Sequence, residues 1–342
     1  MLDGIFDLQF RLDELSRIGD PLPQLAAAID WKKFRRYTDS IRPSERKSNA
    51  GRPPFDSVLM FKILVLQSLY NLSDDATEYQ IRDRLSFMRF LGLSLGDRVP
   101  DAKTIWLFRE QLREAELVEP LFELFESYLG EHGFAARKGQ IIDASIVAAP
   151  RQRNTRAENE TIKETGAAPE AWAEKPAKQA QKDVDARWTQ KNEINYYGYK
   201  NHISVDREHK FIRRWAVTDA AVHDSQMLDA VLDDTNTSGE VWADSAYPSA
   251  QTKVRLEAWG YRPKMQRKGV RGRVLTAWER QGNRTRARVR ARVEHVFGIQ
   301  SMRAAGNLLV RTIGLARARC KIGLRNLAYN LTRYARLRPV QA

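Results

Sequence analysis

Apolar residues in the first third of the chain recur at the spacing of amphipathic helices. Residues 51–54, Gly-Arg-Pro-Pro, are a helix-breaking segment. After it, one such series comprises Val58, Leu59, Ile63, Leu66 and Leu69. Further helices are predicted at about 76–85, 102–112 and 117–129, and a weaker pattern covers residues 10–37. Asp75 and Glu78 stand at capping-box spacing, and Asp101 is placed to cap the helix that follows it.

Short helices separated by tight turns indicate a helix-turn-helix in this region, although a generic helical bundle has the same spacing. Lys103 and Arg109 fall on or near one face of the helix at 102–112 and are candidate DNA contacts. The basic aromatic cluster at residues 31–36 fits two interpretations equally: contact with DNA, or cover for the edge of a core.

The pattern of apolar residues changes at residues 139–147, where a run rich in β-branched residues predicts a buried strand. Residues 199–206 and 211–218 predict a hairpin, and a helix at 224–232, a strand at 240–244, a helix at 250–259 and a strand at 261–263 follow. This order predicts an α/β domain with a mixed sheet. The polar stretch at about 151–195 is expected to be an insertion, either a long loop or a lid over bound DNA.

We therefore expect a helical arm at 1–50, a helical DNA-binding domain at 51–130 and a catalytic domain at 131–342, which helices at about 311–336 complete. The net charge of +14 favours a polyanionic partner, with nucleic acid ahead of an acidic membrane surface. No signal peptide or membrane-spanning run is expected, and the single cysteine, Cys320, fits a reducing compartment, so the cytoplasm is the expected location.

Three acids occupy positions that suit metal-dependent phosphodiester chemistry: Asp143 within one β-run, Asp244 at the end of another, and Glu294 in an arginine-rich helix. Each alone is more often a turn, cap or salt-bridge residue. Magnesium prefers carboxylates and water, and paired divalent ions serve many nucleases and polymerases. Together the acids predict a site for two magnesium ions, with manganese as a substitute.

Basic residues near these acids are candidate phosphate ligands, with a solvated basic face as the alternative: Arg286, Arg290 and Arg292. Lys200 and His202 lie in another candidate motif, although His202 and His223 fit a structural hydrogen-bonding role better. Trp188 and Trp278 are candidates for stacking on a flipped base, with packing as the better interpretation.

As a set, these segments resemble the DDE transposases of the insertion-sequence-five group over nearly the whole chain. The resemblance is carried by residues 141–150, 197–202, 222–225, 243–247 and 290–298, and less specifically by residues 66–74 and 99–105. It implies a ribonuclease-H-like catalytic domain behind a helical module. It also implies that Asp143, Asp244 and Glu294 are the three catalytic acids and that Arg290 is the arginine one turn before the glutamate.

The resemblance further implies cleavage at terminal inverted repeats, joining to target DNA, and a dimer or larger assembly on double-stranded DNA. One position departs from the pattern: Ser301 stands where related enzymes often carry a lysine, and Arg303 is a possible substitute. Two rival functions stay open, a catalytically inactive DNA-binding derivative and a nuclease of the same fold without strand transfer.

Overall fold

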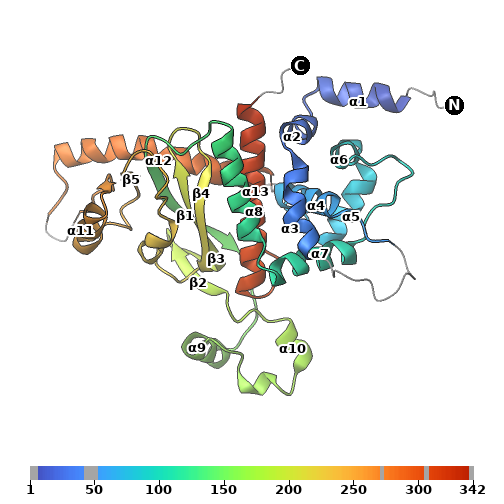
Figure 1. Ribbon diagram of the computed structural model, residues 1–342. Coiled ribbons are helices and arrows are strands. Elements are labelled where there is room, and N and C mark those ends of the chain that lie inside the picture. The colour runs from blue at the N-terminus through green and yellow to red at the C-terminus, as the bar shows by residue number, and fades with distance from the viewer. Residues whose placement is uncertain (1–6, 42–52, 270–272, 304–307, 339–342) are drawn as a thin grey trace. The chain divides into compact units, whose positions relative to one another are not determined.

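The computed structural model describes residues 7–41, 53–269, 273–303 and 308–338 (Figure 1). The chain divides into two compact units. The first contains residues up to Tyr128 and those from Leu324 onward, and the second runs from Leu129 to Gly323. Residues 7–41, expected to form an arm, lie in the same compact unit as the helices that follow them. The last turns of the chain also belong to that unit rather than to the sheet-containing one.

The first unit is helical, and α4 (Ser57–Tyr70) is its central element. Ten of its residues are buried, so the helix is apolar on every side. Asp56 caps its start by accepting hydrogen bonds from the backbone of Val58 and Leu59, and Asn71 ends it in a left-handed conformation. The surrounding elements are α1 (Asp7–Arg17), α2 (Leu22–Ala28), η1 (Trp31–Phe34), α3 (Arg35–Ser40), α5 (Asp74–Asp83), α6 (Leu85–Leu91) and α7 (Ala102–Glu114).

An aromatic cluster fills the centre of this unit and explains the basic aromatic sequence at residues 31–36. Trp31 and Phe34 are buried and contact the ring of Phe61 at centroid distances of 6.2 and 4.8 Å. The four cations between and after them, residues 32, 33, 35 and 36, are exposed. The aromatic half of the cluster therefore covers the core, while Lys33 lies over the ring of Tyr128 and Arg35 pairs with Asp56.

Capping at the start of α5 differs from the prediction. Ser73, not Asp75, is the N-cap, because its hydroxyl accepts a hydrogen bond from the backbone of Ala76. Glu78 accepts instead from the backbone N–H of Ala102, 2.8 Å away, and so joins the start of α7 to α5. Asp101 caps α7 as predicted, through the backbone N–H of Thr104.

A mixed six-stranded sheet forms the second unit, as the sequence indicated. Its strands are β1 (Gln140–Ala148), β2 (Arg187–Lys191), β3 (Ile194–Asp206), β4 (Ile212–Asp219), β5 (Glu240–Trp242) and β6 (Arg262–Pro263). β3 pairs antiparallel with β1, β2 and β4, whereas β5 runs parallel to both β1 and β6. The predicted hairpin is confirmed as β3 and β4.

Gly198 permits the close approach of β3 to β1. Its φ is +151°, and a Cβ at this position would overlap the carbonyl oxygen of Val147. Any residue with a side chain would therefore push the two strands apart.

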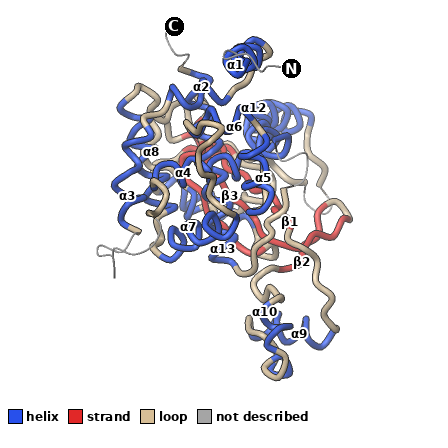
Figure 2. The backbone as a smooth tube through the Cα atoms, turned by 90° about the vertical axis from the view of Figure 1, so that its right-hand side faces the viewer, coloured by secondary structure: helices blue, strands red, loops and turns tan. Residues whose placement is uncertain are grey.

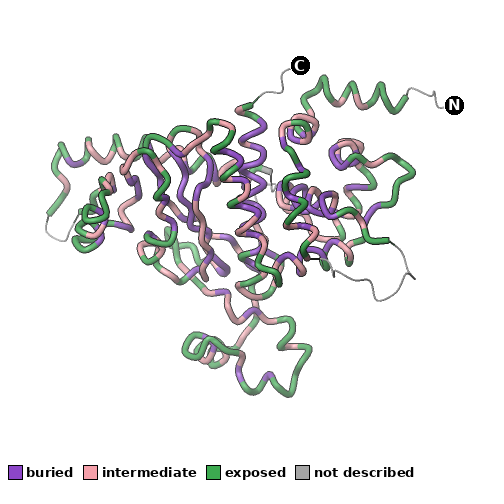
Figure 3. The backbone as a smooth tube through the Cα atoms, in the orientation of Figure 1, coloured by how far each residue is buried: buried purple, intermediate pink, exposed green. Residues whose placement is uncertain are grey.

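Apolar clusters cover both faces of the sheet. Because side chains alternate along a strand, Ile142 and Val147 of β1 point to opposite faces. Ile142 packs with Leu256 of α11 (Ala250–Ala258), and Val147 packs with Ala318 and Ile322 of α13 (Leu315–Leu337). Figure 3 shows the central strands largely buried.

α12 (Ala277–Arg303) and the C-terminal end of α8 (Val118–Glu131) also belong to this unit. The helix predicted at 224–232 is two short 3-10 turns, η3 (Asp224–Met227) and η4 (Asp229–Val231). Among the described residues, no helix is both long and apolar enough to cross a membrane.

The polar insertion is not a long loop. It contains α9 (Arg156–Thr165), η2 (Glu170–Trp172), α10 (Pro176–Ala180) and β2, and α9 and α10 lie together beyond the sheet (Figure 2). Glu158 holds them by accepting hydrogen bonds from the indole of Trp172, at 2.7 Å, and from Lys178. Despite its polar composition, the insertion is therefore a small folded module with one buried tryptophan.

Candidate active site

The sheet register brings Asp143 and Asp244 to the same level on neighbouring strands. β1 and β5 pair in parallel with Gln140 opposite Val241 and Ile141 opposite Trp242. Continuing the same offset past the end of β5 sets Asp143 beside Asp244. The backbone N–H of Ala246 donates to the Asp244 carboxylate at 2.8 Å and fixes the turn in which that aspartate lies. Two carboxylates from distant sequence positions thus face one region.

Glu294 reaches the same region from α12 through Arg290. One guanidinium nitrogen of Arg290, Nη1, lies 3.6 Å from an oxygen of Asp143 and 3.6 Å from an oxygen of Asp244. The other, Nη2, donates to Glu294 at 2.9 Å. Arg290 and Glu294 are one helical turn apart, so their side chains meet on the same face of α12. The structure therefore gathers all three predicted acids around one arginine.

The electrostatics of this cluster centre on Asp143. Burial raises the pKa of its carboxyl to about 6, the positive charge of Arg290 offsets part of that rise, and the negative charge of Asp244 adds to it. Its side chain is 14% exposed, against 29% for Asp244 and 59% for Glu294. The site thus contains one deeply placed acid with few partners and two more accessible ones.

The chemistry of this donor set fits a hard divalent cation. All the ligand atoms are carboxylate oxygens, the set that magnesium prefers, and Asp143 and Asp244 converge on a single cationic nitrogen. Within the described ranges, no group of three potential ligands is already close enough to hold an ion. Asp143, Asp244 and Glu294 could serve as ligands once the Arg290 guanidinium moves away from them.

Lys200 and Asp224 form a second charged pair near the acids. The ammonium group of Lys200 donates to the carbonyl oxygen of Val222 at 2.8 Å and lies 2.8 Å from a carboxylate oxygen of Asp224. Its side chain is 12% exposed. Lys200, predicted to bind DNA, instead fastens the loop after β4 to β3 in this structure.

His202 is fully buried, which contradicts the prediction that it binds DNA and agrees with its structural alternative. Its Nε2 lies 2.9 Å from the hydroxyl of Thr218, and that hydroxyl donates to the backbone carbonyl of Asp219. Nε2 must therefore carry the proton. Burial lowers the pKa of the imidazole to about 4, so the ring is neutral at pH 7. His223 has a local role, capping η3 through the backbone N–H of Ser225.

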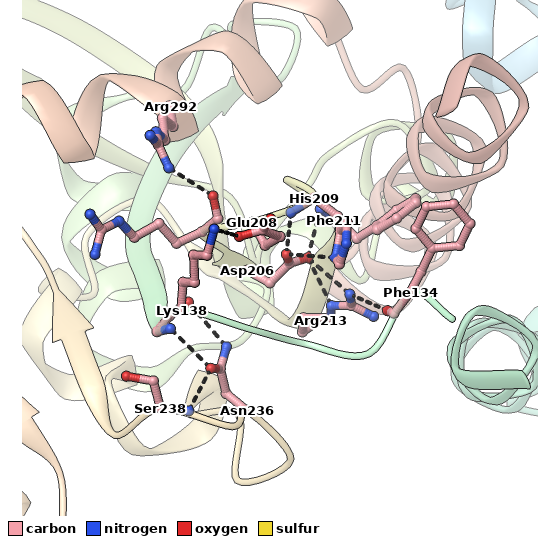
Figure 4. Close-up of polar contacts among 12 residues, drawn as sticks. Phe134, Lys138, Asp206, Glu208, His209, Phe211, Arg213, Asn236, Ser238 and Arg292 are labelled. Atoms are coloured by element: carbon pink, nitrogen blue, oxygen red, sulfur yellow. Dashed lines mark hydrogen bonds and ion pairs between the residues drawn. The ribbon is translucent and has the colours of Figure 1, made fainter. Parts of the chain in front are cut away.

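Arg292, a candidate phosphate ligand, has a backbone partner within the protein. Its guanidinium donates to the carbonyl oxygen of Arg207 at 2.9 Å, which ties α12 to the turn between β3 and β4. Figure 4 shows Arg292 above this turn, with Asp206 and Arg213 in a dense set of polar contacts below it. Arg292 therefore helps to position the helix that carries Glu294.

Arg286 lines a basic cavity of about 530 Å³ that begins at Ser245, next to Asp244. Lys253, Lys268 and Arg273 also line it. Burial lowers the pKa of Arg286, and the positive charge of Arg267 contributes. Trp278 is 72% exposed and lies over the guanidinium of Arg267, and Trp188 is 45% exposed. Neither indole is packed into a core.

The two residues of α7 that were predicted to contact DNA differ in exposure. Lys103 is exposed, whereas Arg109 is 3% exposed and makes a bidentate contact with Asp74, at 2.5 and 2.9 Å, and a third contact with Gln67 at 2.8 Å. Arg109 is therefore a structural residue that links α7 to α4 and α5, and the prediction that it binds DNA is wrong for this conformation.

Sequence reasoning assigned no role to Asp224 or Tyr247, although both lie in motifs it identified. Asp143, Asp224 and Asp244 all raise the pKa of the Tyr247 phenol, so the phenol lies within electrostatic reach of these three carboxylates. Ser301 lies on α12, and the side chain of Arg303, its proposed substitute, is outside the described residues.

Two protein-family models match the chain. Residues 10–111 match a transposase domain (DUF772), and residues 135–331 match a transposase DDE domain, which covers more than half of the 342 residues. Among solved structures, the chain is similar to one in the cryo-EM structure of the piggyBac transposase synaptic complex with hairpin DNA. That match has 12% sequence identity and a TM-score of 0.44, and covers 92% of this chain and 75% of the other.

Proposed function

We propose, from the premise that the chain belongs to the transposase DDE domain family, that it cuts DNA at the ends of a bacterial insertion sequence and joins those ends to target DNA. The observation that carries the proposal is the convergence of Asp143, Asp244 and Glu294 on the guanidinium of Arg290. The resemblance of its motifs to the insertion-sequence-five group supports the bacterial origin.

Asp143, Asp244 and Glu294 are the residues that would hold magnesium, as two ions, with manganese as a substitute. When bound, the metal stabilises negative charge on the attacking and leaving oxygens of the phosphodiester. The protein contributes rigidity at two of the three positions. Asp143 lies inside a strand paired along its whole length with β3, and Asp244 lies in a hydrogen-bonded turn. Glu294 is exposed on α12 and can adjust.

Arg290 balances the charge of the acids before substrate arrives. Its Nε is buried and has no hydrogen-bond partner among the described residues, so part of its donor capacity is unused. A guanidinium binds phosphate oxygens through two parallel hydrogen bonds. We infer that Arg290 turns from the carboxylates to the phosphate beside the scissile bond when DNA binds.

The reaction has two balanced displacements at phosphorus. First, a water oxygen gives up a proton and bonds to phosphorus at the element end, the bond to the 3′ oxygen breaks, and that oxygen takes up a proton. The freed 3′-hydroxyl oxygen then loses its proton and bonds to a phosphorus of target DNA, while the 3′ oxygen that leaves that phosphorus takes up a proton. Neither step needs a covalent link to the protein.

A ribonuclease-H-like fold for the second unit is supported by its strand arrangement. Three antiparallel strands, β4, β3 and β1, continue into the parallel pair β5 and β6. A helix-turn-helix role for the first unit is supported by the short helices α5, α6 and α7 and by the exposure of Lys103. Both assignments are part of the proposal.

The DNA partners are the terminal inverted repeats and the target duplex. The basic cavity beside Ser245 is lined by five cations, Lys253, Arg267, Lys268, Arg273 and Arg286, which suits a strand that continues past the scissile phosphate. Because two element ends must be handled together, we propose a dimer or larger assembly on DNA, acting in the cytoplasm.

The test is a gel assay of labelled DNA that carries the element's own terminal inverted repeat, with magnesium or with EDTA. Nicking at the element boundary should require magnesium and should be lost in Asp143→Asn, Asp244→Asn and Glu294→Gln, while binding to the repeat is retained. Asp234→Asn is the matched control, because that aspartate is 78% exposed and pairs only peripherally with Arg214.

A second substrate distinguishes the rival functions. A pre-cleaved end with a free 3′-hydroxyl should be joined to target DNA by the wild-type protein. Nicking without joining would identify a nuclease of the same fold. Tight binding with no cleavage in magnesium or manganese would identify an inactive DNA-binding derivative.

A further inference from the structure

Tyr247 lies three residues after Asp244 and is 1% exposed. Its ring packs in the apolar cluster on one face of the sheet, with Ile142, Leu228 and Met265 among its neighbours. A tyrosine in such a place could be a phenylalanine as far as packing is concerned. Its hydroxyl group therefore needs a separate explanation.

The hydroxyl oxygen of Tyr247 is buried and has no hydrogen-bond partner in the described part of the chain. Burial raises the pKa of the phenol, the negative charges of Asp143, Asp224 and Asp244 raise it further, and Arg290 lowers it. The phenol therefore lies within electrostatic reach of the charged groups of the candidate active site. At neutral pH the phenol keeps its proton and is a hydrogen-bond donor.

An unpaired buried hydroxyl is unfavourable, and buried polar groups are nearly always paired. The same sheet shows the usual outcome. Tyr199 is also fully buried, and its hydroxyl donates to the carboxylate of Asp183 at 2.5 Å. Tyr247 differs because the acceptor it faces is not supplied by the described residues.

We propose that the Tyr247 hydroxyl donates a hydrogen bond to an oxygen of the ligand that the acid cluster binds. Two sources share this chemistry: a phosphate oxygen of the DNA, and the water that attacks the phosphorus. The inference rests on the proposed function, since it places Tyr247 in contact with the reacting atoms. It makes Tyr247 a catalytic residue rather than a core residue.

The experiment compares Tyr247→Phe with Tyr199→Phe, which removes a hydroxyl that has a partner. Without ligand, Tyr247→Phe should melt at or above the wild-type temperature, and Tyr199→Phe should melt lower. The ligands are magnesium alone, then magnesium with a pre-cleaved terminal duplex that cannot be cut again. Ligand should raise the melting temperature less in Tyr247→Phe than in the wild type.

The two ligand conditions identify the acceptor. A reduced rise already with magnesium alone assigns the hydrogen bond to water held in the site, and a reduced rise only with the duplex assigns it to DNA. Single-turnover cleavage by Tyr247→Phe at saturating DNA should be roughly 100-fold slower, because one donor to a developing charge is lost.

Tyr247→Phe overturns the inference if it melts well below the wild type without ligand, or if ligand stabilises both proteins equally and both cleave at the same rate. Failure of the wild-type protein to cleave any DNA would overturn the proposed function instead. In that case the melting comparison with magnesium still decides whether Tyr247 contacts a ligand.

Discussion

Asp206, which is fully buried, and Asp143, whose side chain is 14% exposed, lie on neighbouring strands of one sheet, yet their surroundings differ sharply. Asp206, at the end of β3, accepts hydrogen bonds from the backbone of His209 and Phe211, at 2.6 and 3.0 Å, and from Arg213 at 3.0 Å (Figure 4). Asp143, on β1, accepts one from the backbone of the adjacent Ala144 and has Arg290 at 3.6 Å.

Under the proposed function, this difference distinguishes a structural carboxylate from one that binds a ligand. A buried charge stabilises a fold only when its hydrogen-bonding capacity is met, as it is for Asp206. Among the described residues, one backbone N–H, that of Ala144, donates to Asp143, and burial raises the pKa of its carboxyl. A carboxyl with a raised pKa close to other acids is expected where a bound ligand supplies the interactions that the protein does not.

The largest predicted effect is on the free energy of unfolding, when each of the two aspartates is replaced by asparagine in turn. Asp206→Asn should lower the free energy of unfolding by about 3–5 kcal/mol, because the buried guanidinium of Arg213 loses its ionic partner. Asp143→Asn should leave it unchanged or raise it at pH 7. Urea unfolding of both variants and the wild type measures this. Similar losses in both variants would remove the distinction between the two aspartates.

The pH dependence of stability should carry the signature of Asp143. Because its pKa is raised from 3.8 to about 6 in the folded protein, its favourable contribution is present below about pH 4 and is lost as pH rises through 6. The wild type should therefore weaken relative to Asp143→Asn across that window, by up to about 3 kcal/mol. Melting curves at pH 4 to 7.5 test it, and a difference independent of pH would contradict it.

Arg290 and Arg292 provide a matched pair on α12. Arg290→Gln should raise the pKa of Asp143 further, because a positive charge that lowers it is removed, and the pH dependence of cleavage should move upward. Arg292→Gln loses the hydrogen bond to Arg207 and should cost about 1 kcal/mol of stability without moving that profile. Equal shifts in both variants would rule out a specific effect of Arg290.

The smallest effect is expected on α7. Lys103→Ala should weaken DNA binding several-fold and reduce the slope of log affinity against log salt by about 0.9, the value for one phosphate contact. Arg109→Ala should lower stability instead, since it breaks the contacts with Asp74 and Gln67. Binding titrations at several salt concentrations measure the first, and an unchanged slope would remove Lys103 from the DNA interface.

Local patterns predicted what depends on local structure. The β3–β4 hairpin, the cap at Asp101 and the mixed sheet follow from alternation, turn residues and the order of elements. The three acids were identifiable because their segments resemble a known family. The geometry that joins Asp143 to Asp244 could not be predicted, because it depends on the parallel register of two strands about a hundred residues apart.

Predictions failed where a distant partner decides the role of a side chain. Arg109 and Lys103 share a helix, and only the position of Asp74 shows that Arg109 is a structural residue. His202 lies in a motif of polar residues, and its burial against Thr218 is a property of the sheet. The helices of the insertion could not be predicted from its polar composition, because the contact between Glu158 and Trp172 stabilises them in place of a larger apolar core.

The most direct test of the account replaces magnesium with ferrous iron, whose hydroxyl radicals cut the polypeptide close to where the ion is bound. The account predicts cuts near residues 143, 244 and 294 that magnesium suppresses by competition and that Asp244→Asn abolishes, while Asp234→Asn leaves them unchanged. Cuts elsewhere in the chain, or cuts near these residues that persist in Asp244→Asn, would contradict the claim that these acids form the metal-binding active site.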